Sequence, residues 1–330
     1  MSGSGFSSAL GVLGKMLNAV FIESYFAPKS KFAVDDIPDL TGKVTIVTGG
    51  NAGIGKETVK ALLAKNAKVY LAARSEDRAK AAIEDLKQTT GKEAVWLKLD
   101  LSSLKSIKAA AEEFLGKEPE LHILFNNAGV IWLPIDQATV DGYDVTWGTN
   151  TLGPFYFTKL LLPALFEAST PENRSRVVNT GSASGITGIS FFGSGLDFAT
   201  FKDSPRRGKY SAGHLYSQSK LGNVIFTQEL ARRHGDKIVT TVVHPGMIRS
   251  EMGRNYANLE NAFVKFLMRV LLYPTPQGAL TQLWAGTSPE TGNLNGEYLV
   301  PWARVSKPRS NDQELGRELW TWFEEQVANV

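Results

Sequence analysis

A tyrosine and a lysine four residues apart are the side chains in this sequence best suited to moving a proton. Tyr216 and Lys220 fall within residues 212–234, where the pattern predicts a helix, so both lie on one face. A phenol has an unperturbed pKa of about 10, too high for a proton shuttle at neutral pH, but a nearby ammonium favours the phenolate. A surface tyrosine beside a lysine is the simpler alternative. Ser182 favours the chemical interpretation, because it comes directly after a predicted strand and its hydroxyl could polarise a carbonyl.

A glycine-rich turn near the start of the chain would supply a partner for that chemistry. Residues 43–55 read KVTIVTGGNAGIG, a short β-branched run followed by Gly49, Gly53 and Gly55 and then by a predicted helix over 56–66. In a strand–turn–helix of this kind, backbone N–H groups and the helix N-terminus can hold a pyrophosphate. An ordinary tight turn is the alternative. A second predicted strand at the expected distance, residues 67–73, favours the nucleotide loop.

Strands and helices alternate along the rest of the chain. Further strands are expected at 95–99, 121–125, 176–179, 238–243 and 295–300, and helices at 75–90 (with a serine cap at Ser75), 102–115, 141–168, 212–234 and 313–327. This order predicts a parallel sheet covered by helices on both faces, in a single domain over residues 41–330. Ligands bind beyond the carboxyl ends of such strands, so the residues that follow them should converge on one crevice: Gly49, Arg74, Asp100, Asn127, Ser182 and Pro245.

The end of the second predicted strand indicates which nucleotide would be bound. An acidic residue there would hold the ribose 2′-hydroxyl of NAD, but residues 71–74 read LAAR. The guanidinium of Arg74 could instead pair with a 2′-phosphate, which favours NADP(H). The alternative is a surface arginine that begins the next helix.

Composition excludes several other functions. The sequence contains no cysteine, its four histidines are scattered, and its 36 basic residues nearly balance 33 acidic ones. Disulfides, thiolate catalysis and metal chemistry are therefore not expected, and neither is a nucleic-acid partner.

Residues 1–40 form an N-terminal extension whose apolar residues recur at helical spacing. The segment over 6–26 is too interrupted by charge to span a bilayer and lacks the basic start of a signal peptide. A helix packed on the body and a helix at a membrane surface both remain open. We expect a cytoplasmic protein, with peripheral membrane contact through residues 6–26 as the open alternative.

Six stretches in order give the chain a resemblance to the short-chain dehydrogenase/reductase family. They are TGGNAGIG at 48–55, NNAG at 126–129, NTLG at 150–153, GS at 181–182, YSQSK at 216–220 and HPG at 244–246. Within that family the chain is similar to the retinol-dehydrogenase and WW-domain-oxidoreductase-like group, without WW domains. The resemblance implies a Rossmann-type, doubly wound parallel sheet of about seven strands, and a family tendency to form homo-oligomers through the helices near 141–168 and 212–234.

The family also implies roles at the matching positions. Tyr216 would be the general acid/base, Lys220 would bind the nicotinamide ribose, Ser182 would position the reacting oxygen, and Asn150 would hold a water in a proton relay. The residues that would contact the cofactor are Gly49, Asn51, Gly53, Ile54, Gly55, Arg74, Asp100, Leu101, Asn127, Tyr216, Lys220, Pro245, Gly246, Ile248 and Ser250. Ser250 stands where the family usually has threonine, which keeps the hydroxyl.

Two apolar segments near the expected site, at 183–215 and 247–275, suggest the substrate. They are either local core under a long loop or a lid and pocket over the nicotinamide. If they form a pocket, the substrate is apolar. We therefore expect an NADP(H)-dependent enzyme that interconverts a carbonyl and an alcohol on a small lipophilic molecule. Reduction of an activated C=C bond, or non-catalytic binding of NADPH by an interaction protein, are the alternatives.

Overall fold

The computed structural model describes residues 24, 27–186, 195–249, 272–306 and 312–330. The predictions made for residues 6–26 apart from Ser24, for Ser250, and for the segment at 250–271 lie outside the described residues.

The described chain is built on one eight-stranded sheet in the order β3-β2-β1-β4-β5-β6-β7-β8, in which only β7 and β8 pair antiparallel. The strands are β1 (Val44–Thr48), β2 (Lys68–Ala73), β3 (Val95–Lys98), β4 (Ile123–Asn126), β5 (Ser175–Thr180), β6 (Ile238–Val243), β7 (Tyr298–Val300) and β8 (Arg304–Val305). Every residue of β1, β5 and β6 is buried, as expected for parallel strands covered on both faces. The predicted doubly wound, Rossmann-like sheet is confirmed.

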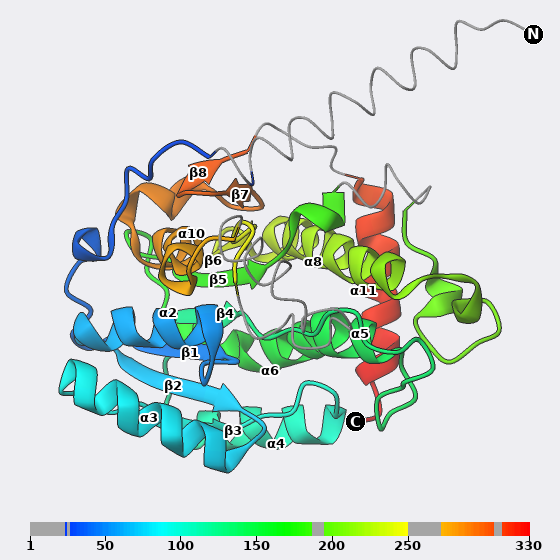
Figure 1. The fold of residues 1–330 in the computed structure, drawn as a ribbon, viewed down its shortest axis with the longest axis horizontal. Coiled ribbons are helices and arrows are strands. Elements are labelled where there is room, and N and C mark those ends of the chain that lie inside the picture. The colour runs from blue at the N-terminus through cyan, green and yellow to red at the C-terminus, as the bar shows by residue number, and fades with distance from the viewer. Residues whose placement is uncertain (1–23, 25–26, 187–194, 250–271, 307–311) are drawn as a thin grey trace, which may run out of the picture.

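Helices cover both faces of this sheet (Figure 1). One face packs against α2 (Gly53–Ala64), α3 (Glu76–Thr90) and α10 (Thr275–Thr287). The other packs against α4 (Leu104–Leu115), α6 (Gly153–Glu167) and α8 (Ala212–His234). Short helical turns lie at Val34–Asp36, Phe198–Thr200, Arg207–Lys209 and Pro289–Asn293. The order of the strands reverses between β1 and β4, which places a ligand crevice at their carboxyl ends.

A C-terminal helix adds a further layer outside α8. α11 (Gln313–Val327) contacts α8 and α6, and Figure 1 shows it as the red helix beside them. Phe323 stacks on Phe155 of α6 with ring centres 4.4 Å apart, and Arg233 of α8 lies over the ring of Trp320 at 4.6 Å. Because α8 is covered by the sheet on one side and by α11 on the other, apolar side chains are buried on nearly all of its faces.

The structure corrects four sequence-based expectations. The long helix expected over 141–168 is three segments: α5 (Val145–Trp147), a π-helical turn (Gly148–Leu152) and α6. Ser75 does occupy the N-cap of α3, but its side chain makes no capping hydrogen bond. The helix α10 and the short strand β8 were not expected. Within the described parts of the chain, no helix combines the length and apolarity needed to cross a membrane.

Candidate functional site

A cavity of about 700 Å³ opens at the carboxyl ends of the strands. Its wall is formed by the segments that follow β1, β2, β3, β4, β5 and β6, together with the first half of α8. Of the residues named from the sequence, twelve line it: Gly49, Asn51, Gly53, Ile54, Gly55, Arg74, Asp100, Leu101, Asn127, Tyr216, Lys220 and Pro245. Of the six residues predicted to converge because they follow strands, five line this cavity and Ser182 does not.

The glycine turn brings α2 unusually close to the end of β1. A Cβ on Gly55 would lie 2.3 Å from the carbonyl oxygen of Gly49 and 2.6 Å from Nδ2 of Asn127, so only glycine fits there. Asn127 Nδ2 donates to the carbonyl of Thr48 at 2.9 Å, which ties β4 to the same turn. The N-cap of α2 is Ala52, which has no side chain able to satisfy the first N–H groups of the helix. The first residues of the helix line the cavity, and such uncapped N–H groups suit an anion.

Two arginines and one carboxylate lie at the end of the cavity near β2 and β3. Arg74 and Arg78 are exposed and line the cavity, and no ion pair among the described residues involves either guanidinium. Asp100 is held in place by Ser102, whose backbone N–H and hydroxyl both donate to its Oδ1, at 2.9 and 2.7 Å. Sequence reasoning missed Arg78, although its spacing of four from Arg74 at the start of a predicted helix could have indicated it.

Tyr216 and Lys220 lie on one face of α8 at the other end of the cavity. The Lys220 ammonium is 5.9 Å from the centre of the Tyr216 ring. Its Nζ donates to the carbonyl of Thr180, at the end of β5, at 2.7 Å. Burial lowers the pKa of Lys220 to about 8, so the ammonium is still the main form at neutral pH. No carboxylate is among the causes of this shift.

Asn150 lies in the π-helical turn and is buried behind the cavity wall. Its Oδ1 accepts from the backbone N–H of Val130 at 2.8 Å, while its Nδ2 donates to the carbonyl of Val130 at 2.9 Å and to Ser219 Oγ at 3.0 Å. Val130 lines the cavity, so Asn150 fixes the wall after β4 against α8. π-Helical turns within helices often occur at functional positions.

Three further candidates do not line the cavity, and a fourth lies outside the described residues. Ser182 follows Gly181, which does line it, and Ser182 Oγ accepts from the backbone N–H of Ser184 at 3.2 Å. Gly246 has a φ of +88° and packs against Trp302, so a Cβ there would lie 2.7 Å from the indole. Ile248 and Ile54 both pack against Gly278 of α10. Ser250 lies outside the described residues.

The wall near Tyr216 contains residues that the sequence did not single out. Ile131, Leu133 and Gln137 line the cavity within the segment after β4. Nothing in their spacing distinguished them from other loop residues. Among the residues that the structure covers, no group of three or more His, Asp or Glu side chains is arranged to hold a metal ion.

Known proteins share sequence and fold with this chain. Residues 43–194 match the model of the short chain dehydrogenase family. A short-chain dehydrogenase/reductase of Armillaria gallica is 54% identical over 311 residues, covering 93% of this chain and 97% of that protein. Retinol dehydrogenase 11 of Homo sapiens is 38% identical, covering 85% of this chain and 84% of that protein.

A solved structure also matches. The RhlG/NADP active-site complex of Pseudomonas aeruginosa superposes with a TM-score of 0.63 at 26% identity, covering 80% of this chain and 96% of that one. The sequence matches extend over most of the chain and the fold is shared. The chain belongs to the short-chain dehydrogenase/reductase family.

Proposed function

We propose that this member of the family is an NADP(H)-dependent oxidoreductase that interconverts a carbonyl and an alcohol on a lipophilic small molecule. The observation that carries the proposal is the position of Tyr216 and Lys220, which line the same cavity as the glycine turn and Arg74. A proton-transfer pair and a phosphate-binding turn are thus joined by one continuous space of about 700 Å³.

The residues around the cavity fit a dinucleotide. The uncapped N–H groups at the start of α2 would hold the pyrophosphate, and Asp100, Leu101 and Asn127 would contact the adenosine half. Lys220 and the turn at Pro245 would contact the nicotinamide half, with Gly246 and Ile248 supporting that turn. When bound, NADP(H) supplies or accepts the hydride.

The chain's own side chains would handle the proton and the reacting oxygen. The buried ammonium of Lys220 favours the phenolate of Tyr216, which would accept a proton from an alcohol or, as the phenol, donate one to a carbonyl oxygen. Ser182 Oγ already accepts a hydrogen bond from Ser184, so its own proton is available for the substrate oxygen. Asn150 donates both side-chain amide protons and its Oδ1 already accepts from the N–H of Val130, so a relay water would donate to the second lone pair of that Oδ1.

The direct test of this mechanism follows NADPH oxidation with aldehydes and ketones of increasing apolarity. Tyr216→Phe is expected to lower turnover by at least about a hundredfold, the range for a lost general acid, while NADPH affinity changes little. Tyr143→Phe is the matched control, because the Tyr143 hydroxyl bonds to Gln326 and does not line the cavity. Turnover retained by Tyr216→Phe would refute the proposed mechanism. Product analysis would reveal reduction of a C=C bond instead of the carbonyl.

The preference for NADPH rests on Arg74 and Arg78, which lie at the cavity end where a 2′-phosphate would be held. Arg74→Ala is expected to raise the KM for NADPH about tenfold or more, since a charged hydrogen bond contributes about 1.5–3 kcal/mol, while the KM for NADH stays the same. Arg317→Ala is a control of equal charge, because that exposed arginine of α11 is not part of the cavity wall. Equal effects on both nucleotides would contradict the assignment.

A further inference from the structure

Trp132 is a large apolar side chain that is 44% exposed, and it is not itself among the residues that line the cavity. Its neighbours on either side, Ile131 and Leu133, both line the cavity wall. The backbone of Trp132 has a φ of +52°, in the left-handed region that bulky residues rarely adopt. Such strain costs roughly 1–3 kcal/mol, and it persists mainly where function requires a side chain to be held in one place.

The indole lies against the same face of α8 that carries Tyr216. A Cβ on Gly213 would be 3.9 Å from Trp132 Nε1, so the indole edge lies directly over Gly213. Gly213, Tyr216 and Lys220 follow one another at spacings of three and four residues and therefore share one helix face. Trp132 thus lies about 4.5 Å along the helix axis before Tyr216, given a rise of about 1.5 Å per residue.

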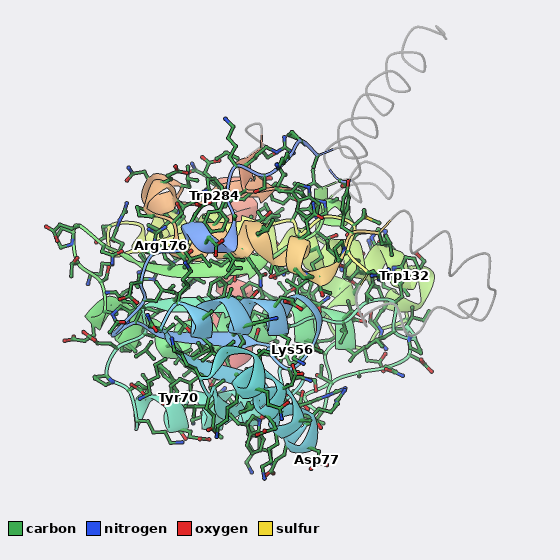
Figure 2. The ribbon with its side chains drawn as sticks, turned by 60° about the vertical axis from the view of Figure 1, so that its left-hand side comes forward. Lys56, Tyr70, Asp77, Trp132, Arg176 and Trp284 are labelled. Atoms are coloured by element: carbon green, nitrogen blue, oxygen red, sulfur yellow. The ribbon has the colours of Figure 1, made fainter. Side chains whose placement is uncertain are left out.

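This position is at the reacting end of the cavity and far from the end that carries Arg74. Trp132 lies on the opposite side of the molecule from Arg176, which is near the start of β5 (Figure 2). It therefore belongs to the side where the strands end. A substrate whose reacting oxygen meets Tyr216 would extend toward the indole along the helix face that Tyr216 shares with Gly213.

Two aromatic rings flank the Gly213 position that the indole approaches. Tyr210 and His214 present a pair of rings 4.3 Å apart next to Gly213. The nearby carboxylate of Asp197 already accepts from the Tyr210 hydroxyl at 2.8 Å and pairs with Arg206, so its charge is engaged. A flat hydrocarbon ring would gain area burial and ring stacking here, whereas a charged group would lose hydration without a dedicated partner.

We propose that Trp132 is a substrate-specificity residue whose indole forms a platform for a flat, unsaturated ring next to the reacting carbonyl or alcohol. The inference rests on the proposed function and narrows it, from lipophilic substrates in general to aryl or conjugated ones. In this proposal the Trp132 indole distinguishes flat rings from saturated ones, while Ile131 and Leu133 make apolar contacts with either kind.

The test compares two ketones of similar size, methyl phenyl ketone and methyl cyclohexyl ketone, as substrates with NADPH. Trp132→Leu keeps apolar bulk and removes the π-face. It is expected to lower kcat/KM for the phenyl ketone about three- to tenfold, mainly through KM, the range for a lost aromatic pair. The cyclohexyl ketone should change by less than about twofold, and Trp132→Phe should restore most of the preference for the phenyl ketone.

Val140→Ala removes another exposed apolar side chain, 81% exposed in the same connection between β4 and α5, and should leave both ketones unaffected. If Trp132→Leu lowers kcat/KM equally for both ketones, or for neither, the platform is refuted while the proposed function stands. If the wild-type enzyme reduces no carbonyl at all, the proposed function fails and the platform fails with it.

Discussion

Replacing Lys220 by methionine should abolish turnover and should show how much the buried ammonium lowers the free energy of unfolding. The lysine has an ordinary pKa of 10.5, and burial lowers it to about 8 in the folded protein. Between these two values the unfolded chain binds the proton and the folded chain does not, so the free energy of unfolding rises with pH. Below pH 8 both states are protonated, and the folded protein carries the full cost of a buried ammonium.

The magnitude follows from the size of the shift. A difference of about 2.5 pKa units corresponds to about 3 kcal/mol, of which about 2–3 kcal/mol would be recovered between pH 7 and pH 10. Lys220→Met has no proton to lose and keeps the side-chain length. The Thr180 carbonyl that Lys220 contacts also accepts from Asn223 Nδ2 at 3.4 Å, so it keeps a partner in the variant.

The assay is urea unfolding of both proteins, without nucleotide, at pH 7 and at pH 10. Titration of groups that do not interact with Lys220 is common to the two proteins and cancels in their difference, and the same comparison in a Tyr216→Phe background removes the contribution of the neighbouring phenol. We expect the free energy of unfolding of the wild type, relative to Lys220→Met, to be about 2–3 kcal/mol higher at pH 10 than at pH 7. The variant should also have lost turnover. A difference that is independent of pH, or that decreases as pH rises, would refute the reasoning about burial of Lys220.

Three other substitutions or measurements test the architecture. Gly55→Ala places a Cβ 2.3 Å from the Gly49 carbonyl oxygen, so it should lower the free energy of unfolding by about 1–3 kcal/mol. It should also weaken NADPH binding, measured by fluorescence. Gly208→Ala is the control and should have neither effect, because no atom lies within 4 Å of the added Cβ. Ser24→Ala removes a 3.0 Å hydrogen bond to the buried His244, which lies beside the Pro245 turn. We expect the free energy of unfolding, measured by thermal unfolding, to fall by about 1 kcal/mol and the KM for NADPH to rise. Unchanged values would contradict a structural link between Ser24 and the site. Since α11 covers α8, we expect that two copies of the chain do not associate through α8, and a dimer cross-linked between the α8 helices of two copies would contradict this.

The elements with strong local signals could be predicted from the sequence. The bounds of α8, β6 and α11 agree with the ranges drawn from hydrophobic pattern alone, at 212–234, 238–243 and 313–327. Each is long or strongly apolar and is bounded by polar or glycine residues. The candidate residues that follow strand ends could be found for the same reason, because parallel topology by itself brings them to one edge.

Other features depend on tertiary contacts that have no local signature. The π-helical turn at Gly148–Leu152 shifts hydrogen bonds by one residue while the apolar pattern continues through it. The helix α10 is buried on most sides and contains two glycines, which the sequence pattern could not distinguish from a loop. In the structure, a Cβ on Gly286 would lie 2.4 Å from the Phe125 ring, so that glycine is needed for α10 to approach β4.

A buried set of polar side chains fixes where α8 lies on the sheet. It therefore also fixes the position of Tyr216, which α8 carries. Asn126 of β4 donates to Asn179 of β5 at 2.8 Å, and Asn179 donates to Thr227 of α8 at 3.0 Å. Thr227 follows Lys220 by seven residues, two turns along the same helix face. The Lys220 ammonium meets the sheet at Thr180, directly after Asn179, so α8 is tied to β5 by directional bonds at both positions. An apolar interface would tolerate small sliding of the helix, whereas these directional bonds favour one register and therefore one position of the Tyr216 hydroxyl relative to the cavity.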